Sequence, residues 1–294
     1  MKSLKTYLLT AVMAILMFIP ISTLSAAGSW TIIGGPGAQF AIAGVNLYGL
    51  SPDKQGVFLY NGTPGSWTKV GGPAEKLIGG GPYLCAIFPA SGDIYKYTGV
   101  EQKWVKIGGP GAQFAYGGDT LYGLSPDKQG VFRYNGTPGS WTKVGGPAKE
   151  LVSGIDLCAI DPASGDIYRY SETDHKWTRV GGPGAQFVGA GPILYGLSPD
   201  KQGVFRYNGH PTSWVQTGAS NSWTKIGGPA KELIGGGANL YAIYPTSGDI
   251  YKYTEAEQKW EKIGGPGSRF VAYGNSLYGV SPDGSKILSF SWLP

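Results

Sequence analysis

The chain has 294 residues, with 24 Lys and Arg against 19 Asp and Glu and a net charge of +5. The basic residues are spread along the sequence, which excludes the clustered Lys and Arg of a nucleic-acid groove. The 50 Gly and 21 Pro stand beside 19 Tyr, 10 Phe and 9 Trp, and this mixture favours many short strands joined by tight turns over a disordered chain.

The first 27 residues have the pattern of a secretory signal peptide. Two lysines precede an apolar run from about Tyr7 to Ile21, and small residues follow at positions 25 to 27. The run is shorter than the ~20 residues of a membrane span and contains Pro20. The alternatives are a buried helix or a retained membrane anchor. We expect residues 1–27 to be cleaved, the mature chain 28–294 to lack a membrane span, and the protein to be secreted or periplasmic.

The rest of the sequence is a tandem repeat led by the motif Trp-x-x-Ile/Val-Gly-Gly-Pro. The spacings are 37, 37, 37, 36, 46 and 37 residues. The long interval contains Trp214 and VQTGASNS, which we expect to be a solvent-exposed insertion where the fifth blade joins the sixth. Seven repeats fill positions 28–294, and they start at Trp30, Trp67, Trp104, Trp141, Trp177, Trp223 and Trp260.

Two kinds of repeat alternate. The first kind is based on GGPGAQF, LYGLSPDKQGVF and YNG, and it starts at Trp30, Trp104, Trp177 and Trp260. The second kind contains GGPA and SGDIY, and it starts at Trp67, Trp141 and Trp223. The duplicated unit is therefore a pair of repeats. Positions 47–74 and 121–148 are identical except for Leu59 against Arg133.

Each repeat holds four strand-like runs separated by turn residues. In the third repeat these runs are WVKIG, QFAYG, TLYGLS and GVFRYN, with GPG, GGD and SPDKQG between them. Gly and Pro recur within every candidate helix, which excludes a helical repeat. Four short strands in about 37 residues are typical of propeller blades. We predict an all-β fold, a seven-bladed β-propeller with four antiparallel strands per blade.

The two ends of the array predict how the ring closes. The last repeat stops after three strands, of which KILSFS is the last, and no further Trp strand follows. The first repeat begins with a spare strand, SWTII around Trp30. If this N-terminal strand pairs beside KILSFS, every blade has four strands and the ring leaves no exposed sheet edge.

Aromatic residues two apart on a predicted strand share one face, as do Tyr95 and Tyr97 or Phe132 and Tyr134. We interpret these rings as packing between blades. The same interpretation applies to the repeat-leading Trp residues, whose large rings seal against the next blade while the N–H meets a polar partner.

The two cysteines, Cys85 and Cys158, occupy equivalent LCAI positions in the second and fourth repeats, where the sixth has Tyr241. Equivalent positions in blades two apart lie beyond the ~7 Å between Cα atoms that a disulfide spans. We predict two free, buried thiols.

Carboxylates recur in the SPD and SGD turns, one per turn. Asp in a tight turn usually accepts hydrogen bonds from its own backbone, and this is our interpretation of the whole set. One carboxylate per turn is also far from the about 6 to 8 oxygen ligands of calcium. The NGT at Asn61 and Asn135 fits either a glycosylation acceptor or a tight turn. The carboxylates are Asp53, Asp127, Asp200 and Asp283 in SPD, and Asp93, Asp166 and Asp249 in SGD.

Groups for catalysis or cofactor binding are scarce. The only histidines, His175 and His210, lie in unlike contexts without counterparts in other repeats. No His or Cys residues have metal-ligand spacing, and no Gly-rich loop leads into a helix. We expect no catalytic residue, no metal and no cofactor.

Residues that recur only in the second kind of repeat are the candidates for ligand binding. Each of these repeats combines a carboxylate, an aromatic ring and a cation within four residues, which we place beside the Trp that leads the repeat. Turn formation and strand packing explain the same residues. We predict three equivalent sites, and none at the seam where the seventh and first blades, both of the first kind, meet. The candidates are Trp67, Asp93, Tyr95 and Lys96; Trp141, Asp166, Tyr168 and Arg169; and Trp223, Asp249, Tyr251 and Lys252.

The order of Trp-x-x-Ile/Val-Gly, LYGL and Ile/Val-Tyr/Phe-x-Tyr resembles the tectonin family of β-propellers over positions 29–294. The segments GGPGAQF and SPDKQG, and the alternation of two kinds of repeat, depart from the usual pattern of that family. The resemblance implies a propeller. It also implies sugar binding, which is common in secreted propeller lectins at several sites in or near the grooves between blades. No ligand residue carries over position by position.

Three functions follow, in this order. The first is a secreted, multivalent carbohydrate-binding protein whose weak contacts with glycans or a cell-surface polysaccharide add through effective concentration. The second is a non-catalytic protein-interaction or adhesion scaffold. The third is a propeller hydrolase or lyase. We rank it last because such an enzyme would carry unlike catalytic groups on a few blades, whereas the repeats of this chain are nearly identical. The sequence names neither the sugar nor the oligomeric state.

Overall fold

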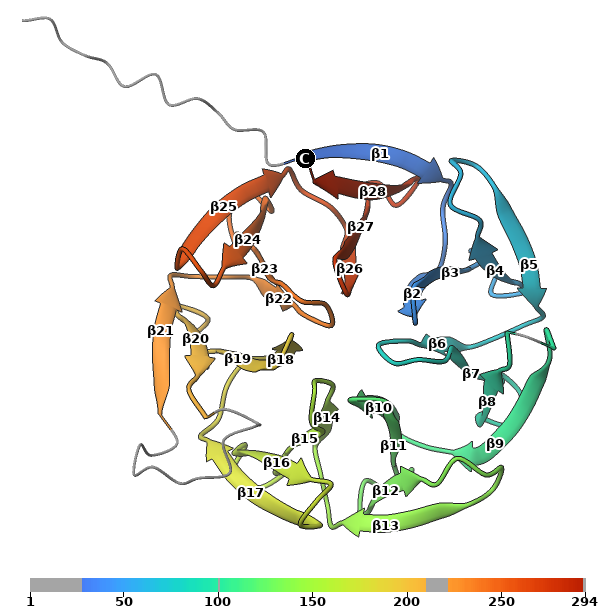
Figure 1. The fold of residues 1–294 in the computed structure, drawn as a ribbon, viewed down its shortest axis with the longest axis horizontal. Coiled ribbons are helices and arrows are strands. Elements are labelled where there is room, and N and C mark those ends of the chain that lie inside the picture. The colour runs from blue at the N-terminus through green and yellow to red at the C-terminus, as the bar shows by residue number, and fades with distance from the viewer. Residues whose placement is uncertain (1–27, 100, 210–221, 293–294) are drawn as a thin grey trace, which may run out of the picture.

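Seven four-stranded antiparallel sheets form a closed ring, which confirms the predicted all-β, seven-bladed β-propeller (Figure 1). The structure is a computed structural model, and it describes residues 28–99, 101–209 and 222–292. In these ranges no helix is long and apolar enough to cross a membrane. Residues 1–27, for which we predict a signal peptide, lie outside the described residues.

Each blade runs from an inner strand near the axis to an outer strand at the rim (Figure 1). Blade 1 contains β2 (Gln39–Ala43), β3 (Asn46–Leu50), β4 (Val57–Tyr60) and β5 (Trp67–Gly71). Blade 2 contains β6 (Lys76–Ile78), β7 (Cys85–Ile87), β8 (Asp93–Tyr97) and β9 (Trp104–Pro110). Blade 3 contains β10 (Gln113–Gly117), β11 (Thr120–Leu124), β12 (Val131–Tyr134) and β13 (Trp141–Gly145).

The later blades repeat this order. Blade 4 contains β14 (Glu150–Val152), β15 (Cys158–Ile160), β16 (Ile167–Ser171) and β17 (Lys176–Gly181). Blade 5 contains β18 (Gln186–Ala190), β19 (Ile193–Leu197), β20 (Val204–Tyr207) and β21 (Trp223–Gly227). Blade 6 contains β22 (Glu232–Ile234), β23 (Leu240–Ile243), β24 (Ile250–Thr254) and β25 (Lys259–Gly264). Blade 7 contains β26 (Arg269–Tyr273), β27 (Ser276–Val280), β28 (Ile287–Trp292) and β1 (Gly28–Gly34).

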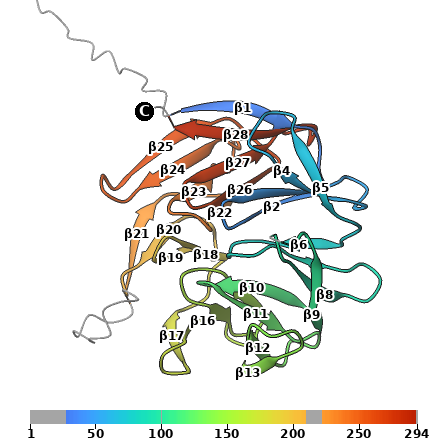
Figure 2. The same cartoon turned by 45° about the vertical axis from the view of Figure 1, so that its right-hand side comes forward.

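Blade 7 joins the two ends of the described chain. The N-terminal strand β1 pairs antiparallel with β28, and Trp30 lies opposite Phe290. Figure 2 shows β1 along β28, with β27 and β26 following toward the axis. The predicted closure by the N-terminal strand is confirmed, and every blade has four strands.

The repeat-leading Trp residues seal neighbouring blades, as predicted. Trp104, for example, donates its indole N–H to the carbonyl of Val70 in the outer strand of blade 1, at 2.8 Å. The first Gly of each motif makes room for this ring, because a Cβ at Gly71 would lie 2.9 Å from the Trp104 nitrogen. Equivalent indole bonds are made by Trp30, Trp67, Trp141, Trp177, Trp223 and Trp260.

A glutamine in each GGPGAQF segment ties a blade of the first kind to the next blade. The Gln39 side chain accepts from the backbone N–H of Leu77 and donates to its carbonyl, both at 2.8 Å. Gln113 and Gln186 repeat this pair of bonds to Leu151 and Leu233. These bonds connect inner strands that no sheet ladder connects.

The seam between blades 7 and 1 uses another residue at the position of that glutamine. Arg269 stands there, and its Nη1 donates to the carbonyl of Ala38 at 2.8 Å. Neither Gln39 nor Arg269 is among the residues predicted from the sequence.

The SPD turns have the predicted chemistry. Asp53 accepts hydrogen bonds from the Ser51 hydroxyl at 2.6 Å and from the Gln55 N–H at 3.0 Å. Lys54 between them adopts the left-handed conformation with φ of 60°. Hydrogen bonds from Ser and backbone donors lower the pKa of all four SPD carboxylates, Asp53, Asp127, Asp200 and Asp283.

Both cysteines are free and buried, as predicted. Burial raises the pKa of Cys85 to about 11 and that of Cys158 to about 12. The Cys85 sulfur lies 3.6 Å from the hydroxyl of Tyr116 in the neighbouring blade. Both thiols therefore stay protonated and act as small core residues.

The long interval between repeats falls inside blade 5, between β20 and β21. The prediction that it lies where the fifth blade joins the sixth is wrong, because the Trp strand β21 is the outer strand of blade 5. Trp214 and residues 215–221 of VQTGASNS lie outside the described residues. The base of the interval is closed by the Asn208 N–H, which donates to the carbonyl of Ser222 at 3.0 Å.

Candidate functional site

Three equivalent cavities lie between neighbouring blades. In each case the first blade is formed mainly by a repeat of the first kind and the following blade mainly by a repeat of the second kind. They occupy the groove between blades 1 and 2, that between blades 3 and 4, and that between blades 5 and 6. Their volumes are about 240, 240 and 350 Å³ in that order. They belong to the three repeats in which we predict ligand sites.

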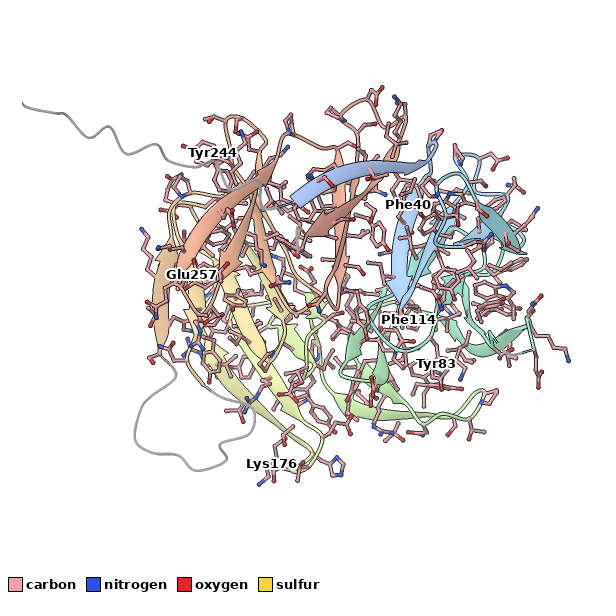
Figure 3. All side chains as sticks on the ribbon, turned by 45° about the horizontal axis from the view of Figure 1, so that its top comes forward. Phe40, Tyr83, Phe114, Lys176, Tyr244 and Glu257 are labelled. Atoms are coloured by element: carbon pink, nitrogen blue, oxygen red, sulfur yellow. The ribbon has the colours of Figure 1, made fainter. Side chains whose placement is uncertain are left out.

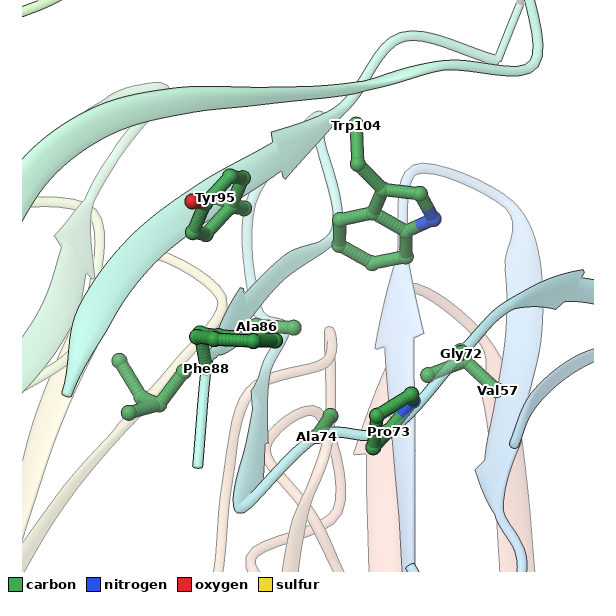
Figure 4. Close-up of a pocket in the computed structure, with 9 residues that line it drawn as sticks. Val57, Gly72, Pro73, Ala74, Ala86, Phe88, Tyr95 and Trp104 are labelled. Atoms are coloured by element: carbon green, nitrogen blue, oxygen red, sulfur yellow. The ribbon is translucent and has the colours of Figure 1, made fainter. Parts of the chain in front are cut away.

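The groove between blades 1 and 2 illustrates how each cavity is built. Its floor and walls come from the link Gly72–Ala74 and from Ala86 and Ile87 of β7. Three aromatic rings complete it: Phe88 after β7, Tyr95 on β8 and Trp104 on β9. Figure 4 shows these rings and Pro73 around a common space.

Strand alternation decides which rings reach the cavity. Tyr95 and Tyr97 lie on the same face of β8, the face toward blade 1. Tyr97 is buried against Trp104, with ring centroids 5.2 Å apart, and so fixes one wall. Tyr95, nearer the end of the strand, is half-buried and contributes its ring to the cavity.

A charged pair lies on the same face as each tyrosine. Asp93 accepts from the Lys106 ammonium at 2.7 Å, and Lys106 is the cross-strand neighbour of Tyr95. Asp249 pairs in the same way with Lys262 at 2.7 Å, and Asp166 with two nitrogens of Arg179 at 2.6 and 3.1 Å. A carboxylate and a cation thus lie beside the tyrosine of each groove, outside the set of residues that line the cavity.

Our interpretation of the SGD carboxylates as turn residues is wrong. The turn is closed by backbone bonds from the Gly92 N–H to the Phe88 carbonyl at 2.9 Å and from the Phe88 N–H to the Asp93 carbonyl at 2.8 Å, and the Ser91 hydroxyl accepts from the Asp93 N–H at 3.3 Å. The Asp93 carboxylate instead pairs across the strands with Lys106. The pKa of Asp93 is held below its usual value, first by the hydrogen bond from Lys106 and then by that from Ser91.

The structure keeps Asp and Tyr of each predicted set together but separates them from the Trp of the same repeat. Trp67 bonds to Ile33 of blade 7 and packs between blades 7 and 1. Trp141 packs between blades 2 and 3, and Trp223 between blades 4 and 5. The rings that line the three grooves are Trp104, Trp177 and Trp260.

This shift has a topological cause. The Trp strand that begins a sequence repeat is the outer strand of one blade, and the other three strands of that repeat belong to the next blade. Sequence repeats and blades are therefore offset by one strand. The predicted closure by SWTII already implies this phase. The sequence therefore carried the signal that identifies Trp104, Trp177 and Trp260, and our assignment did not use it.

The predicted cations lie on the opposite strand face from the tyrosines. Lys96 lies over the ring of Tyr83, 4.1 Å from its centroid, and Lys252 lies over the ring of Trp292 at 3.8 Å. Arg169 lies 3.9 Å from a carboxylate oxygen of Asp156. The cations near the cavities are instead Lys106, Arg179 and Lys262.

A fourth cavity of about 270 Å³ lies at the seam between blades 7 and 1. Its lining includes Phe58, Ser51 and Trp67, which take the places of Tyr95, Phe88 and Trp104. Phe40 also lines it, and the lining contains no charged side chain. Figure 3 shows Phe40 on β2 within the ring, whereas Tyr244 lies at an outer edge. Our prediction that the seam carries no site stays a prediction.

The described ranges contain no group of three or more His, Cys, Asp or Glu residues that could hold a metal ion. In each groove aromatic faces lie next to a paired carboxylate and cation.

No protein-family model and no curated protein matches the sequence. Solved structures match in fold. PorZ, a surface component of the type-IX secretion system of Porphyromonas gingivalis, has a TM-score of 0.61 and 11% identity over 91% of this chain and 39% of its own. The extracellular domain of a one-component system of B. thetaiotaomicron has a TM-score of 0.55 and 12% identity, covering 90% of this chain and 40% of its own.

A plant protein is similar over most of both chains. The CRINKLY WD40 ectodomain of an Arabidopsis thaliana receptor kinase has a TM-score of 0.54 and 15% identity over 84% of this chain and 92% of its own. The present chain spans about two fifths of the bacterial chains it matches. At these identities the likeness shows the fold alone. Fold and comparisons together define a seven-bladed β-propeller, and the tectonin resemblance stays a prediction.

Proposed function

We propose that this propeller is a secreted or surface-exposed, non-catalytic protein that binds carbohydrate in the grooves between its blades. One observation carries the proposal: the same groove occurs three times, each with Tyr and Trp in its wall and an Asp–Lys or Asp–Arg pair beside the Tyr. A catalytic centre would need unlike groups on a few blades, whereas these blades repeat nearly the same residues.

The groove chemistry suits a sugar ring. Tyr95 and Phe88 offer apolar surface to the C–H groups of a pyranose, while Asp93 and Lys106 offer an acceptor and donors to its hydroxyl groups. The cavities of about 240 to 350 Å³ lie at the small end of ligand pockets, which span about 300 to 1,000 Å³. This size favours one or two sugar rings per groove.

A glycan array probed with labelled chain 28–294 tests the proposal. We expect binding to a defined group of glycans, and loss of this binding when Tyr95, Tyr168 and Tyr251 are all replaced by Ala. The matched control replaces Lys96 and Lys252 by Ala, because both lie on the opposite face of their strands. Absence of binding to every glycan, from a protein that melts cooperatively, would reject carbohydrate binding.

A protein-interaction or adhesion scaffold is the second candidate. It is favoured by the similar folds, two of which are an extracellular domain and a receptor-kinase ectodomain. The array separates the two functions. A scaffold without sugar sites would bind no glycan, whether or not the three tyrosines are present.

A further inference from the structure

The three grooves differ at one wall position, that of Phe88, Asp161 and Tyr244. We infer that this position divides them into two classes, and that the grooves between blades 1 and 2 and between blades 5 and 6 are the tighter sites for a pyranose ring. The groove between blades 3 and 4 is the weaker site. This inference rests on the proposed function and names the residue that sets affinity in each groove.

In the two tighter grooves a second ring stands beside the groove tyrosine. The Phe88 and Tyr95 centroids are 6.0 Å apart with an interplanar angle of 59°. Tyr244 and Tyr251 repeat this arrangement at 6.2 Å and 56°. The arrangement gives a sugar two aromatic surfaces in place of one.

These added rings are poorly covered by the protein itself. Phe88 is 39% exposed and Tyr244 is 42% exposed, whereas most large apolar side chains of the described residues lie in the core. A ring that lines a cavity and stays this exposed has apolar surface available for a ligand. Packing between blades does not account for it.

The groove between blades 3 and 4 has a carboxylate at the same position. Asp161 accepts hydrogen bonds from the backbone N–H of Ser164 at 2.7 Å, from its hydroxyl at 2.9 Å and from the N–H of Ala163 at 3.0 Å. These bonds hold the carboxylate in its own turn. The groove therefore keeps Tyr168 and Trp177 but lacks the second ring.

The chain contains its own matched loops for a test. Positions 88–93 read FPASGD and positions 161–166 read DPASGD, so they differ only at the wall position. Phe88→Asp reproduces in blade 2 a loop that already folds in blade 4, and Asp161→Phe does the reverse. Either variant changes the wall without introducing a turn sequence foreign to this propeller.

The experiment titrates ¹⁵N-labelled chain 28–294 with the methyl glycosides of glucose, galactose, mannose, fucose and N-acetylglucosamine. The indole N–H signals of Trp104, Trp177 and Trp260 report the three grooves separately, because one of these rings lines each groove. The ring of Trp141, which packs between blades 2 and 3 and lines none of the four cavities described above, is the internal reference. Melting temperatures confirm that each variant is folded.

For a glycoside that binds, we expect the Trp104 and Trp260 signals to shift at concentrations about tenfold below those that shift Trp177, a factor equal to about 1.4 kcal/mol. In Phe88→Asp we expect the Trp104 signal to shift only at the higher concentrations that shift Trp177, while the response of Trp260 stays unchanged. Asp161→Phe moves the Trp177 response to the tighter class. Tyr244→Asp weakens the Trp260 response alone.

Two outcomes overturn the inference, and they are distinct. Parallel shifts of all three signals, or affinities unchanged by the exchange of Phe88 and Asp161, would leave sugar binding standing and reject the two classes. No shift with any of the glycosides would count against the proposed function and the inference together.

Discussion

At the scale of the residue, the one difference between the two long copies has a partner elsewhere in the chain. Arg133 donates from its Nε to both carboxylate oxygens of Glu172, at 3.0 and 3.1 Å, and the Tyr122 hydroxyl also donates to Glu172. In the earlier copy Gly99 stands in the place of Glu172, and Leu59 packs against the apolar cluster between blades 1 and 2. The arginine is thus found in the copy that offers a carboxylate to pair with it, and the leucine in the copy that offers none.

This compensation predicts a coupling between two blades. Arg133→Leu removes the two hydrogen bonds from the guanidinium to Glu172, and we expect a loss of about 1 to 2 kcal/mol in the free energy of unfolding, measured in urea. Glu172→Gly added to that variant should restore part of the loss. Leu59→Arg is the control, because blade 2 offers it no carboxylate at position 99. Strictly additive losses in the double variant would contradict the coupling.

The turn carboxylates predict how stability depends on pH. Hydrogen bonds from Ser281 and from the backbone of Ser285 lower the pKa of Asp283 to about 2 from an ordinary value of 3.8. A carboxylate whose pKa is depressed by folding stabilises the protein above its unfolded pKa, and the stabilisation is lost as the pH falls toward the folded value.

We therefore expect the melting temperature to fall as the pH is lowered from about 4 to about 2. In Asp283→Asn this slope should be smaller, because one of the depressed carboxylates is gone. A melting temperature that rises on acidification over this window would show that other groups dominate. Circular dichroism at a series of pH values measures it.

At the scale of the element, strand β1 holds the ring shut. Ile33 is buried at the centre of the apolar cluster between blades 7 and 1, and the Trp30 indole donates to the carbonyl of Ile263 in blade 6 at 2.9 Å. Without β1, strand β28 would become an exposed edge, and a chain with an open edge tends to pair with other chains.

Removal of residues 28–34 should destabilise the propeller by about 3 kcal/mol or more, because the buried Ile33 side chain and the partly buried Trp30 ring are both lost. We expect a lower melting temperature and concentration-dependent association. An unchanged melting temperature would show that the closing strand is dispensable.

The connection between β20 and β21 supplies the matched control. In blade 1 the same connection is the short NGTPGS, closed by the Asn61 N–H on the Ser66 carbonyl at 3.0 Å. Asn208 and Ser222 make the same contact at 3.0 Å. Replacing residues 209–221 by Gly-Thr-Pro-Gly should leave the ring folded, with a melting temperature close to that of the parent. Aggregation of this variant would contradict our view of the segment as an insertion.

At the scale of the whole molecule, the ring orients its three grooves alike. All three are formed by the link that enters a blade and by the loop after its second strand, so they open on the same face of the propeller. A protein with several sites on one face gains affinity on a surface that displays many ligands, because later contacts form at high effective concentration.

This arrangement predicts an avidity effect, measurable by surface plasmon resonance. Binding to a densely coated sugar surface should be about 10² to 10⁴ times tighter than binding to the same sugar free in solution. The gain should shrink as the coating is diluted, and it should be lost when Tyr168 and Tyr251 are both replaced by Ala, which leaves one groove with its tyrosine. Equal affinity for the dense surface and the free sugar would mean that one groove acts at a time.

Much of the fold and part of the site follow from the sequence. The spacing of the Trp motifs, the turn residues between short strands and the spare strand at Trp30 determined the number of blades, the number of strands and the closure of the ring. These features could be predicted because strand length and turn chemistry depend on neighbouring residues, and because the motifs recur at a regular spacing. The two free cysteines followed from the same period, since equivalent positions in a ring are held apart by its symmetry.

Only the tertiary structure decided which residues share a groove. Tyr95 and Lys96 are neighbours in sequence, yet strand alternation sends them to opposite faces, one toward blade 1 and the other toward blade 3. The predicted closure of the ring already implied that the strand of Trp104 completes the sheet of blade 2, but only the structure shows that Trp104 and Tyr95 line one cavity. The Asp93 carboxylate pairs with Lys106, 13 residues on, because the pairing of β8 with β9 brings the two side chains together. A groove between two blades is made by packing across the ring, and no period along the chain encodes it directly.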